Sequence, residues 1–530
     1  MAVDHLESDK VVAQNGQESL VEAMMKPGFY PRPAAEIEHE ETHISHLFFV
    51  GDVVYKIKKP VRFSFLDFST LPRRLFFLQQ ELELNRRLAP SVYLGVLPIG
   101  LDERGWRLGG SGEPREYALV MRRLPAKRML SFLLATHQAT PAMMEELATV
   151  LGRFHGRAEA IRDIDPDGYV AALEKQWAEN RTDLDPWIDQ ADRNTLQAID
   201  DFGRELLAAR RDLLWRRVAE GWVRDVHGDL HAEHICFARE GIQIFDCIEF
   251  SAELRRCDLA SEIAFLLMDT EVRGGAALVK PFIERYGELI QDPELPRLLP
   301  FFECYRALVR AKVHALRLRR WNEQTENYFR FAARLVWRQS APFIVLISGL
   351  TGTGKSSLAR ELARRTGLSV INSDVVRKRL AGKPGRYAAP INQGIYNPAM
   401  TERTYASLAR QAEKRIAAGE GVILDATFIK RAHREKIARL AEKHRTPLFA
   451  IHCSASDRTV EERLARRASQ GRDISDGRWD IYVQQKGAFE PLDELPSSAR
   501  FEANAELPPD QLASQCEDFL RSQLRARRLH

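Results

Sequence analysis

Short apolar runs that end in glycine or a polar residue recur through the last part of the chain. Residues 343–347, 369–372, 421–425 and 448–452 each form such a run, and a helical pattern over 358–363 follows the first of them. Runs of this length predict strands, and apolar positions three and four residues apart predict helices. The pattern therefore predicts alternating strands and helices in this region.

The first part of the chain follows a different pattern. Two runs rich in β-branched and aromatic residues flank Gly51-Asp52, which predicts a β-hairpin. Further on, aromatic and leucine residues recur at helical spacing, as is typical of a buried helical core. The expected strands lie at 44–50, 53–58, 92–99, 116–121 and 242–245, and the expected helical regions at 72–90 and 281–339.

Composition changes this picture little. The chain has 530 residues, of which 45% are apolar and 29% charged, and its formal net charge is +4. A globular chain of this length is expected to form two or three domains. So small a net charge gives no general argument for binding nucleic acid or a membrane. Arginine-rich stretches at 306–338 and 521–528 are interpreted as solvated helix faces or tails.

The cysteines and the N-terminus bear on cellular location. None of the six cysteines belongs to a Cys-x-x-Cys pair, which predicts free thiols in a reducing compartment. The chain starts without a basic region followed by an apolar one, and no apolar run approaches membrane-spanning length. We therefore expect a cytoplasmic protein with no membrane partner. Residues 1–25 are expected to form a flexible tail.

A glycine-rich segment between the run at 343–347 and the helix after it carries the clearest chemistry. Gly349-Leu-Thr-Gly-Thr-Gly-Lys-Ser356 matches the phosphate-binding pattern GxxxxGK[ST] in its strand–turn–helix context. Glycines allow backbone N–H groups to surround a polyphosphate, and the helix adds its positive N-terminal end. Lys355 is expected to reach the β and γ phosphates of ATP, and Ser356 to ligate Mg²⁺. The predicted nucleotide-binding residues here are Gly349, Thr351, Gly352, Thr353, Gly354, Lys355, Ser356 and Ser357. A glycine-rich turn that binds nothing is the alternative.

Charged residues follow the next two predicted strands. Asp374 and Arg377 lie three residues apart, so a helix places them on one face. Beside a γ-phosphate, the carboxylate can take the proton of an acceptor hydroxyl or orient it, and the arginine can hold phosphate charge. Asp425 ends an apolar strand and is expected to hold the water shell of Mg²⁺.

Several arginines cluster on a later predicted helix and the loop after it. In small kinases such a stretch forms a lid that closes on the transferring phosphoryl group and excludes water. A solvated helix face is the alternative. The arginines are Arg463, Arg466, Arg467 and Arg472, of which Arg463 and Arg467 are the predicted catalytic pair.

Kinase-like signals also occur in the first part of the chain. Lys56 lies on a predicted strand and Glu81 on the next predicted helix, as in protein kinases, where the lysine holds the α and β phosphates and the glutamate fixes the lysine. Further on, His227-Gly-Asp-Leu-His231 is followed by a strand that ends at Asp246.

The HGDLH segment resembles the catalytic loop of aminoglycoside phosphotransferases and related small-molecule kinases. The resemblance implies that Asp229 is the catalytic base, that Asp246 is the main Mg²⁺ ligand, and that His234 occupies the position of a second metal ligand, normally Asn. It also implies a structural role for Asp258. A neutral imidazole suits Mg²⁺ less well than an oxygen ligand. The sequence also has no glycine-rich phosphate loop at 42–46, where the family would place one.

Two other interpretations of the histidines stay open. Three histidines in a short span could form a zinc site. They could also be purely structural. The three are His227, His231 and His234.

The last part of the chain, 341–524, resembles small P-loop kinases, a group that includes polynucleotide 5′-hydroxyl kinases, chloramphenicol phosphotransferase and zeta toxins. The shared features are the phosphate loop, the Asp-x-x-Arg pair at Asp374 and Arg377, the strand ending in Asp425 and the arginine lid. In these relatives the Asp activates the acceptor. The order of the two parts resembles a class of bacterial two-domain predicted kinases.

These observations predict an aminoglycoside phosphotransferase-like bilobal α+β domain, followed by a P-loop three-layer α/β domain with a parallel sheet. The predicted limits are 26–340, with lobes at 26–125 and 126–340, and 341–530. We expect an ATP- and Mg²⁺-dependent phosphotransferase that acts on a hydroxyl of a small molecule. The alternatives are a polynucleotide 5′-hydroxyl kinase, which is less favoured, and a nucleotide-switched binding protein with a pseudokinase first half.

Overall fold

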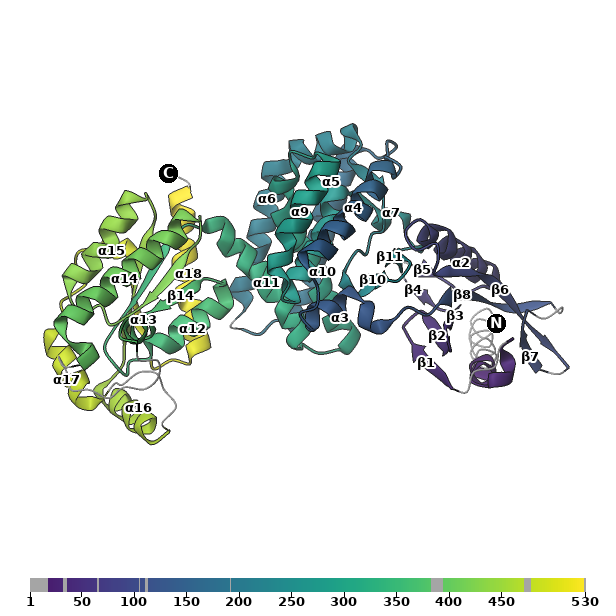
Figure 1. Cartoon of the computed structure of the whole chain (residues 1–530). Helices are drawn as coiled ribbons and strands as arrows, with labels where there is room; N and C mark the ends of the chain where they lie inside the picture. The colour runs from purple at the N-terminus through teal and green to yellow at the C-terminus, as the bar shows by residue number, and fades with distance from the viewer. Residues whose placement is uncertain are drawn as a thin grey trace, which may run out of the picture. The chain divides into compact units, whose positions relative to one another are not determined.

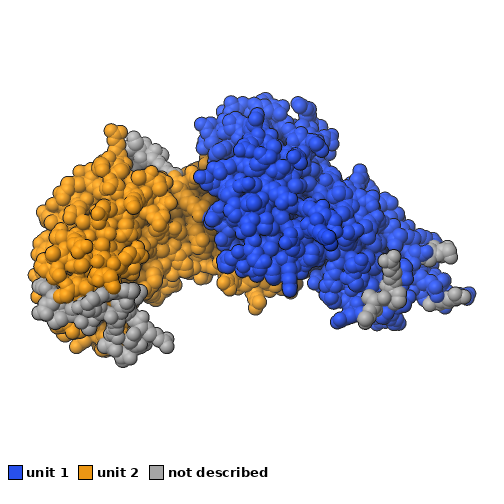
Figure 2. Space-filling view, in the orientation of Figure 1, with its two compact units in different colours: residues 1–175, 207–307 blue, residues 176–206, 308–530 orange. Residues whose placement is uncertain are grey.

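The computed structural model describes residues 18–31, 36–63, 66–103, 105–109, 113–190, 192–382, 394–470 and 478–528. The chain forms two compact units, which Figure 2 shows in different colours. Unit 1 consists of residues 1–175 and 207–307, and unit 2 of residues 176–206 and 308–530. The predicted domain limit is at 340, but the segments 176–206 and 308–340 belong to unit 2, the unit that contains the phosphate loop.

Unit 1 begins with an antiparallel sheet in the order β1-β2-β3-β8-β6-β7 (Figure 1). The predicted hairpin is confirmed as β2 and β3, whose registered pairs run from Ser45–Lys58 to Val50–Val53. One helix, α2 (Leu71–Arg86), packs on this sheet. The strands are β1 (Ile37–Glu41), β2 (Ser45–Val50), β3 (Val53–Lys58), β6 (Tyr93–Asp102), β7 (Gly105–Leu108) and β8 (Pro114–Arg122), with a small β4 (Arg62–Phe63) and β5 (Leu66–Asp67) pair.

The end of the expected N-terminal tail belongs to this core. Residues 18–24 are helical, and Leu20 and Met24 are fully buried beside Phe48 and Ile57 of the hairpin. The tail predicted over 1–25 is thus packed from residue 18 on, because its apolar residues cover one face of the sheet. Residues 1–17 lie outside the described part of the chain.

The rest of unit 1 is mainly helical and carries the HGDLH segment between short strands. Helix α8 has almost every residue buried. The helices are α3 (Leu130–Ala135), α4 (Pro141–Arg157), α5 (Pro166–Leu184), α6 (Arg193–Glu220), α7 (Ala252–Arg255), α8 (Leu259–Val272), α9 (Ala276–Ile290) and α10 (Leu295–Leu318). The short strands are β9 (Val223–Asp225), β10 (Ile235–Ala238), β11 (Gly241–Ile244) and β12 (Arg256–Asp258). The limits between the units fall inside α5, α6 and α10.

Unit 2 is built on a parallel sheet in the order β14-β15-β13-β16-β17, which confirms the predicted three-layer α/β fold. Every neighbouring pair is parallel, so the carboxyl ends of the strands share one edge, where ligands bind in such folds. The strands are β13 (Ile344–Ser348), β14 (Ser369–Asn372), β15 (Val422–Asp425), β16 (Leu448–Ser454) and β17 (Arg500–Asn504).

Apolar helix faces cover both sides of this sheet. One core joins α11, α12 and α18 to the strands, and the other joins α13, α14 and α15 to the opposite face (Figure 1). The helices of unit 2 are α11 (Glu323–Ser340), α12 (Lys355–Thr366), α13 (Ser373–Leu380), α14 (Pro398–Ala417), α15 (Arg431–Lys443), α16 (Asp457–Gln470), α17 (Trp479–Ala488) and α18 (Pro509–Arg528).

Two absences concern the described residues alone. No helix among them is both long and apolar enough to cross a membrane. All six cysteines lie in described segments, are buried and form no disulfide, which agrees with the predicted free thiols.

Candidate active sites in the two units

The phosphate loop of unit 2 joins β13 to α12, as the sequence predicts. Its glycines adopt positive φ angles, +138° at Gly349, +81° at Gly352 and +100° at Gly354, which disfavour residues with a side chain. A β-carbon at Gly349 would also lie only 2.4 Å from the carbonyl oxygen of Cys453. The loop therefore requires glycine both for its backbone angles and for its close contact with β16.

Polar groups of the loop find partners within the protein. Lys355 Nζ donates to the carbonyl oxygen of Leu350 at 2.6 Å, and burial lowers the pKa of Lys355, against the effect of Asp425. The backbone N–H of Thr351 donates to Gln485 Oε1 of α17 at 2.8 Å. A bound polyphosphate would offer better acceptors to both donors. The contact of Gln485 with the loop has no signal in the sequence.

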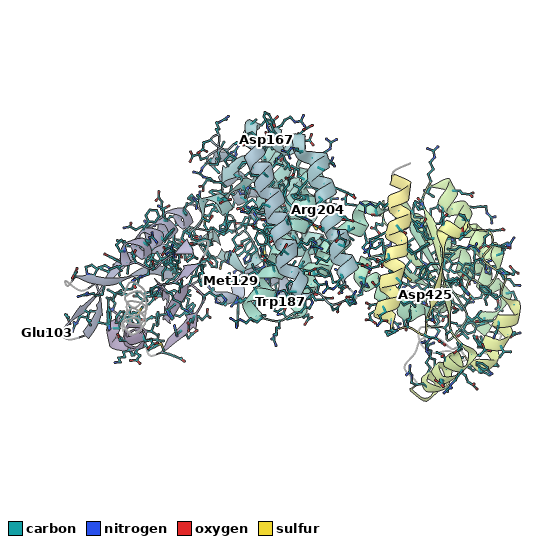
Figure 3. The ribbon with its side chains drawn as sticks, turned by 180° about the vertical axis from the view of Figure 1, so that it is seen from behind. Glu103, Met129, Asp167, Trp187, Arg204 and Asp425 are labelled. Carbon is teal, nitrogen blue, oxygen red and sulfur yellow. The ribbon has the colours of Figure 1, made fainter. Side chains whose placement is uncertain are left out.

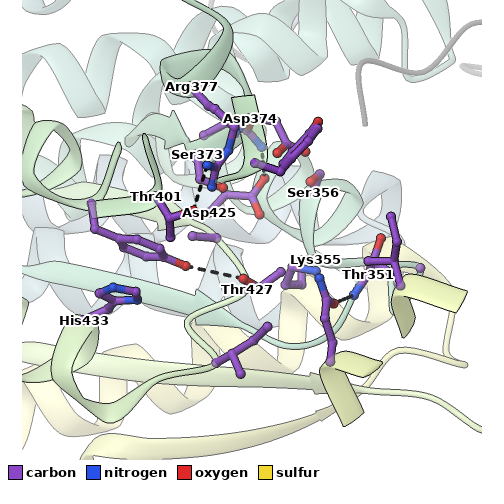
Figure 4. Close-up of a pocket in the computed structure, with 18 of the residues that line it drawn as sticks. Thr351, Lys355, Ser356, Ser373, Asp374, Arg377, Thr401, Asp425, Thr427 and His433 are labelled. Carbon is purple, nitrogen blue, oxygen red and sulfur yellow. Dashed lines mark hydrogen bonds between the residues drawn. The ribbon is translucent and has the colours of Figure 1, made fainter. Parts of the chain in front are cut away.

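A cavity of about 470 Å³ lies at this end of the sheet. Figure 4 shows how the loop, α13 and the end of β15 surround it. The predicted site residues that line it are Thr351, Gly352, Gly354, Lys355, Ser356, Asp374, Arg377, Asp425 and Arg467. Four further predicted residues, Gly349, Thr353, Ser357 and Arg463, are not among those that line it.

Asn372 holds the two acids of the cavity in place. Its Oδ1 accepts the backbone N–H groups of Asp374 at 2.9 Å and Val375 at 3.0 Å, so it caps α13. Its Nδ2 donates to Asp425 Oδ2 at 2.6 Å, and Asp425 ends β15 in the sheet of unit 2 (Figure 3). Burial raises the pKa of Asp374, against the effect of Arg377 and Lys355. Asn372 is a site residue that the sequence analysis missed.

Arg377 lies in the cavity wall, where neighbouring groups hold its guanidinium. Its Nη1 donates to the carbonyl oxygen of Ile395 at 3.2 Å and to Thr401 Oγ1 at 3.1 Å, and its guanidinium lies 5.2 Å from the ring centre of Tyr396. Among the described residues, the buried Nε of Arg377 has no hydrogen-bond partner. The arginine shares a helix face with Asp374, as predicted, and most of its contacts come from the segment before α14 and from α14 itself.

The predicted lid arginines differ in what they contact. Arg467 of α16 lines the cavity. Arg463 donates to the carbonyl oxygens of Thr353 at 3.3 Å and Ala505 at 2.6 Å, so it supports the loop backbone. Arg466 also lies on α16, and Arg472 lies outside the described residues. The catalytic role of these arginines stays a prediction.

Oxygen atoms dominate the predicted magnesium position of unit 2. The Ser356 hydroxyl and the Asp425 carboxylate both face the cavity, and both are hard donors of the kind that Mg²⁺ prefers. These residues therefore fit a magnesium ion that is bound together with a nucleotide.

The lysine and glutamate predicted in unit 1 form an ion pair. Lys56 Nζ lies 2.6 Å from Glu81 Oε1 and 3.4 Å from Asp246 Oδ1. Burial opposes charge on both partners, yet their attraction prevails, so the pKa of Lys56 is raised and that of Glu81 lowered. The strand, the helix and the end of β11 thus meet as the resemblance implies.

A second lysine shares this glutamate. Lys58 Nζ lies 2.8 Å from Glu81 Oε2 and 2.5 Å from Glu249 Oε1, and its side chain is fully buried. The sequence places Lys56 and Lys58 on one face of the strand, but it gives no sign that Glu249 would complete the network. Lys58 and Glu249 are therefore additions to the predicted site.

Backbone hydrogen bonds fix the HGDLH turn. Glu262 of α8 accepts the N–H groups of His227 at 2.9 Å and Gly228 at 3.1 Å. Asp258 pairs with the buried Arg217 at 2.6 Å and caps α8 through the N–H of Ala260. The structure thus gives Asp258 the kind of structural contacts that the resemblance implies.

Asp229, His234 and Asp246 come together at the end of this turn. His234 Nε2 lies 3.5 Å from Asp246 Oδ2, and His234 Nδ1 lies 3.7 Å from Asp229 Oδ2. Asp246 has a positive φ of +63°, which is rare outside glycine. Burial opposes ionisation of Asp246, but Lys56 and then His234 outweigh it, and the pKa of Asp246 is lowered to about 2.

The structure does not bring the three histidines together as ligands of one zinc ion. His227 is fully buried, and its Nε2 lies 2.9 Å from the carbonyl oxygen of Phe245. The group whose ligand atoms lie within 4.8 Å of one another consists of Asp229, His231 and His234. The family has an Asn oxygen as metal ligand where this chain has the nitrogen of His234. The metal position of unit 1 therefore fits Mg²⁺ less well than the metal position of unit 2.

Comparisons with known proteins agree with the two-part organisation. A model of the phosphotransferase enzyme family matches residues 65–301, and a model of the AAA domain matches residues 344–492. The uncharacterized protein Rv2004c of Mycobacterium tuberculosis is 33% identical over 449 residues, which cover 83% of this chain and 88% of the relative. The uncharacterized protein Mb2027c of Mycobacterium bovis matches equally well. The chain belongs to the family of these mycobacterial proteins.

These matches confirm the predicted order, a phosphotransferase domain followed by a P-loop domain. The protein is a kinase. Among solved structures, a sugar kinase from Janibacter sp. HTCC2649 aligns with 34% of this chain and 95% of its own, at 20% identity and a TM-score of 0.27. A gluconokinase from Sinorhizobium meliloti 1021 aligns with 35% of this chain and 97% of its own, at 17% identity and a TM-score of 0.26.

Proposed function

We propose that unit 2 transfers the γ-phosphoryl group of ATP to a hydroxyl group of a small molecule. The observation that carries this proposal is one cavity that collects the phosphate loop, Asp374 and Asp425 (Figure 4). Phosphoryl transfer needs mainly positioning and charge neutralisation, and these residue types supply both.

Each group then has a defined part in the transfer. The loop N–H groups and Lys355 hold the phosphates, with Lys355 moving from the Leu350 carbonyl to a phosphate oxygen. Ser356 and Asp425 would hold Mg²⁺, which neutralises phosphate charge. Asp374 accepts or orients the proton of the acceptor hydroxyl. Arg377, anchored by Ile395 and Thr401, supports the wall on which the acceptor rests.

The rest of the cavity supports a small polar acceptor. Besides the nucleotide-binding groups, its wall offers hydroxyl and imidazole groups that can bond to hydroxyls of a substrate. These are Thr401, Tyr405, Thr427 and His433. Tyr405 is fixed by stacking on His433 at 3.9 Å and by accepting the N–H of Phe428 at 3.1 Å, so it is a rigid part of the wall.

For unit 1 we propose a second nucleotide site. Its support is the ion pair of Lys56 and Glu81, with Asp246 3.4 Å from Lys56 and His234 between Asp246 and Asp229, as the resemblance to aminoglycoside phosphotransferases implies. The nucleotide phosphates would contact Lys56, and Asp229 would take the place of the catalytic base.

A screen for acceptors tests the proposal for unit 2. The full chain is incubated with γ-labelled ATP and either a pool of small hydroxyl compounds or oligonucleotides with free 5′-hydroxyls. We expect label in the small-molecule pool, and a fall of at least ~100-fold in kcat in Asp374→Asn, because a general base contributes about 10²–10⁴. ATP affinity of this variant should stay within a few-fold. Label on oligonucleotides alone would replace the proposal with a 5′-hydroxyl kinase.

A further inference from the structure

The hydrogen bonds of His234 determine which of its nitrogens can bind an ion. His234 Nδ1 lies 2.9 Å from the backbone carbonyl oxygen of Asp229, and a carbonyl can only accept a hydrogen bond. The neutral imidazole therefore carries its proton on Nδ1. Its lone pair at Nε2 faces Asp246 Oδ2 at 3.5 Å, so two acceptors oppose each other.

His231 shows the opposite arrangement. Its Nδ1 accepts the backbone N–H of Glu233 at 3.3 Å, so the proton of the neutral ring lies on Nε2, which faces Asp229 Oδ2 at 3.5 Å. His231 thus orients the Asp229 carboxylate and has no lone pair directed at it. The lone pair of His231 Nδ1 accepts the Glu233 N–H and lies 3.8 Å from Glu233 Oε2, whereas the lone pair of His234 Nε2 faces Asp246.

The distance and the charge both suit a divalent ion at this point. Zinc binds nitrogen and oxygen at about 2.0–2.1 Å, which separates two tetrahedral ligand atoms by about 3.3 Å. The surrounding cluster contains four carboxylates and two ammonium groups, so its carboxylates exceed its ammonium groups by two negative charges. The carboxylates belong to Glu81, Asp229, Asp246 and Glu249, and the ammonium groups to Lys56 and Lys58.

We propose that His234 Nε2 and Asp246 Oδ2 bind a divalent ion that accepts nitrogen ligands, Mn²⁺ or Zn²⁺, in preference to Mg²⁺. Phosphate oxygens of a nucleotide would complete its coordination. Nitrogen ligands suit these transition metals, whereas Mg²⁺ prefers oxygen. The substitution of His for Asn thus changes the ion of this site. The inference concerns unit 1 and does not rest on the transfer reaction proposed for unit 2.

Manganese binding to the full chain without nucleotide tests this proposal. Pulsed electron paramagnetic resonance detects a nitrogen bonded directly to Mn²⁺. We expect one Mn²⁺ per chain with such a nitrogen, displaced by Zn²⁺ at lower concentrations than those of Mn²⁺. Mg²⁺ should displace it only at concentrations at least ~10-fold higher, since changes around a metal ligand alter affinity about 10–100-fold. In His234→Asn the nitrogen signal should vanish and Mg²⁺ should compete almost equally with Mn²⁺.

Two control variants separate this site from others in the chain. His39→Gln disrupts another imidazole pair of unit 1, in which His39 Nε2 lies 3.1 Å from His46 Nδ1. Asp425→Asn alters the ion position proposed in unit 2. Both variants should retain the nitrogen signal. Wild-type protein that binds Mn²⁺ without a nitrogen ligand, or that binds none because a protonated His234 bridges the two carboxylates, would overturn the proposal. A nitrogen signal that survives in His234→Asn would overturn it equally.

Discussion

At the scale of single residues, the cavity of unit 2 depends on one amide. Asn372 caps α13 with its oxygen and bonds to Asp425 with its nitrogen, so it fixes the backbone under Asp374 and the carboxylate beside it at once. Support of this kind holds functional side chains in one geometry before a ligand binds. The geometry of the proposed transfer is thus set by a residue without charge.

The protonation of Asp374 leads to a prediction about pH. Burial raises the pKa of Asp374, and Arg377 is the strongest opposing influence. Transfer should therefore weaken as pH falls through this raised pKa, because the carboxylate is lost. In Arg377→Met the pKa rises further, so the acid limb of kcat should move to higher pH. The pH profile of kcat, scaled to its own maximum, measures this shift.

Arg379→Met is the matched control, because Arg379 lies on the same helix but is exposed. Its acid limb should coincide with that of the wild type. An acid limb that stays in place in Arg377→Met would show that Asp374 does not control the rate.

Residues of the phosphate loop could be predicted from the sequence because their chemistry is local. The spacing of Gly349, Gly354 and Lys355 fixes a turn whose function needs no distant partner. The contacts of Arg377 could not be predicted in this way. Its partners Ile395 and Thr401 lie 18 and 24 residues further along, and their approach depends on how α14 packs.

At the scale of elements, α12 links the phosphate loop to the helical part of unit 2. Arg365 near its end is almost fully buried and pairs with Glu517 of α18 at 2.5 Å and with Asp192, just before α6, at 3.0 Å. Arg330 of α11 reaches the same Asp192 at 2.8 Å. These contacts explain why segments far apart in sequence belong to one unit.

Removal of this buried arginine should destabilise unit 2 strongly. Arg365→Ala leaves the buried Glu517 with only the more distant Arg521, at 3.9 Å, and the expected loss is about 3–5 kcal/mol in the free energy of unfolding. Arg364→Ala is the neighbouring control, since Arg364 is half-exposed in its pairs with Glu361 and Glu326 and should contribute only about 0–1 kcal/mol. Hydrogen exchange of the β13 amides measures both losses. Equal effects of the two variants would contradict this account of α12.

At the scale of the whole molecule, the sequence indicates a phosphotransferase part followed by a P-loop part, and the compact units divide the chain at other positions than 340. The short connection at 340–342 suggests a boundary there, yet Trp337 of α11 is buried in the same core as Phe343 and Leu358 of unit 2. Helical periodicity shows that α11 has an apolar face, but not which core that face covers. The kinase character of both halves was predictable because it rests on motifs, whereas the limits of the units depend on packing.

The central claim is that phosphoryl transfer takes place in unit 2. The most direct measurement is transfer of label from γ-labelled ATP to the small-molecule pool by the full chain, compared among wild type, Asp229→Asn and Asp374→Asn. The account predicts that transfer to the unit 2 acceptor persists in Asp229→Asn and falls at least ~100-fold in Asp374→Asn. Transfer that survives in Asp374→Asn but is lost in Asp229→Asn would contradict it and assign the reaction to unit 1.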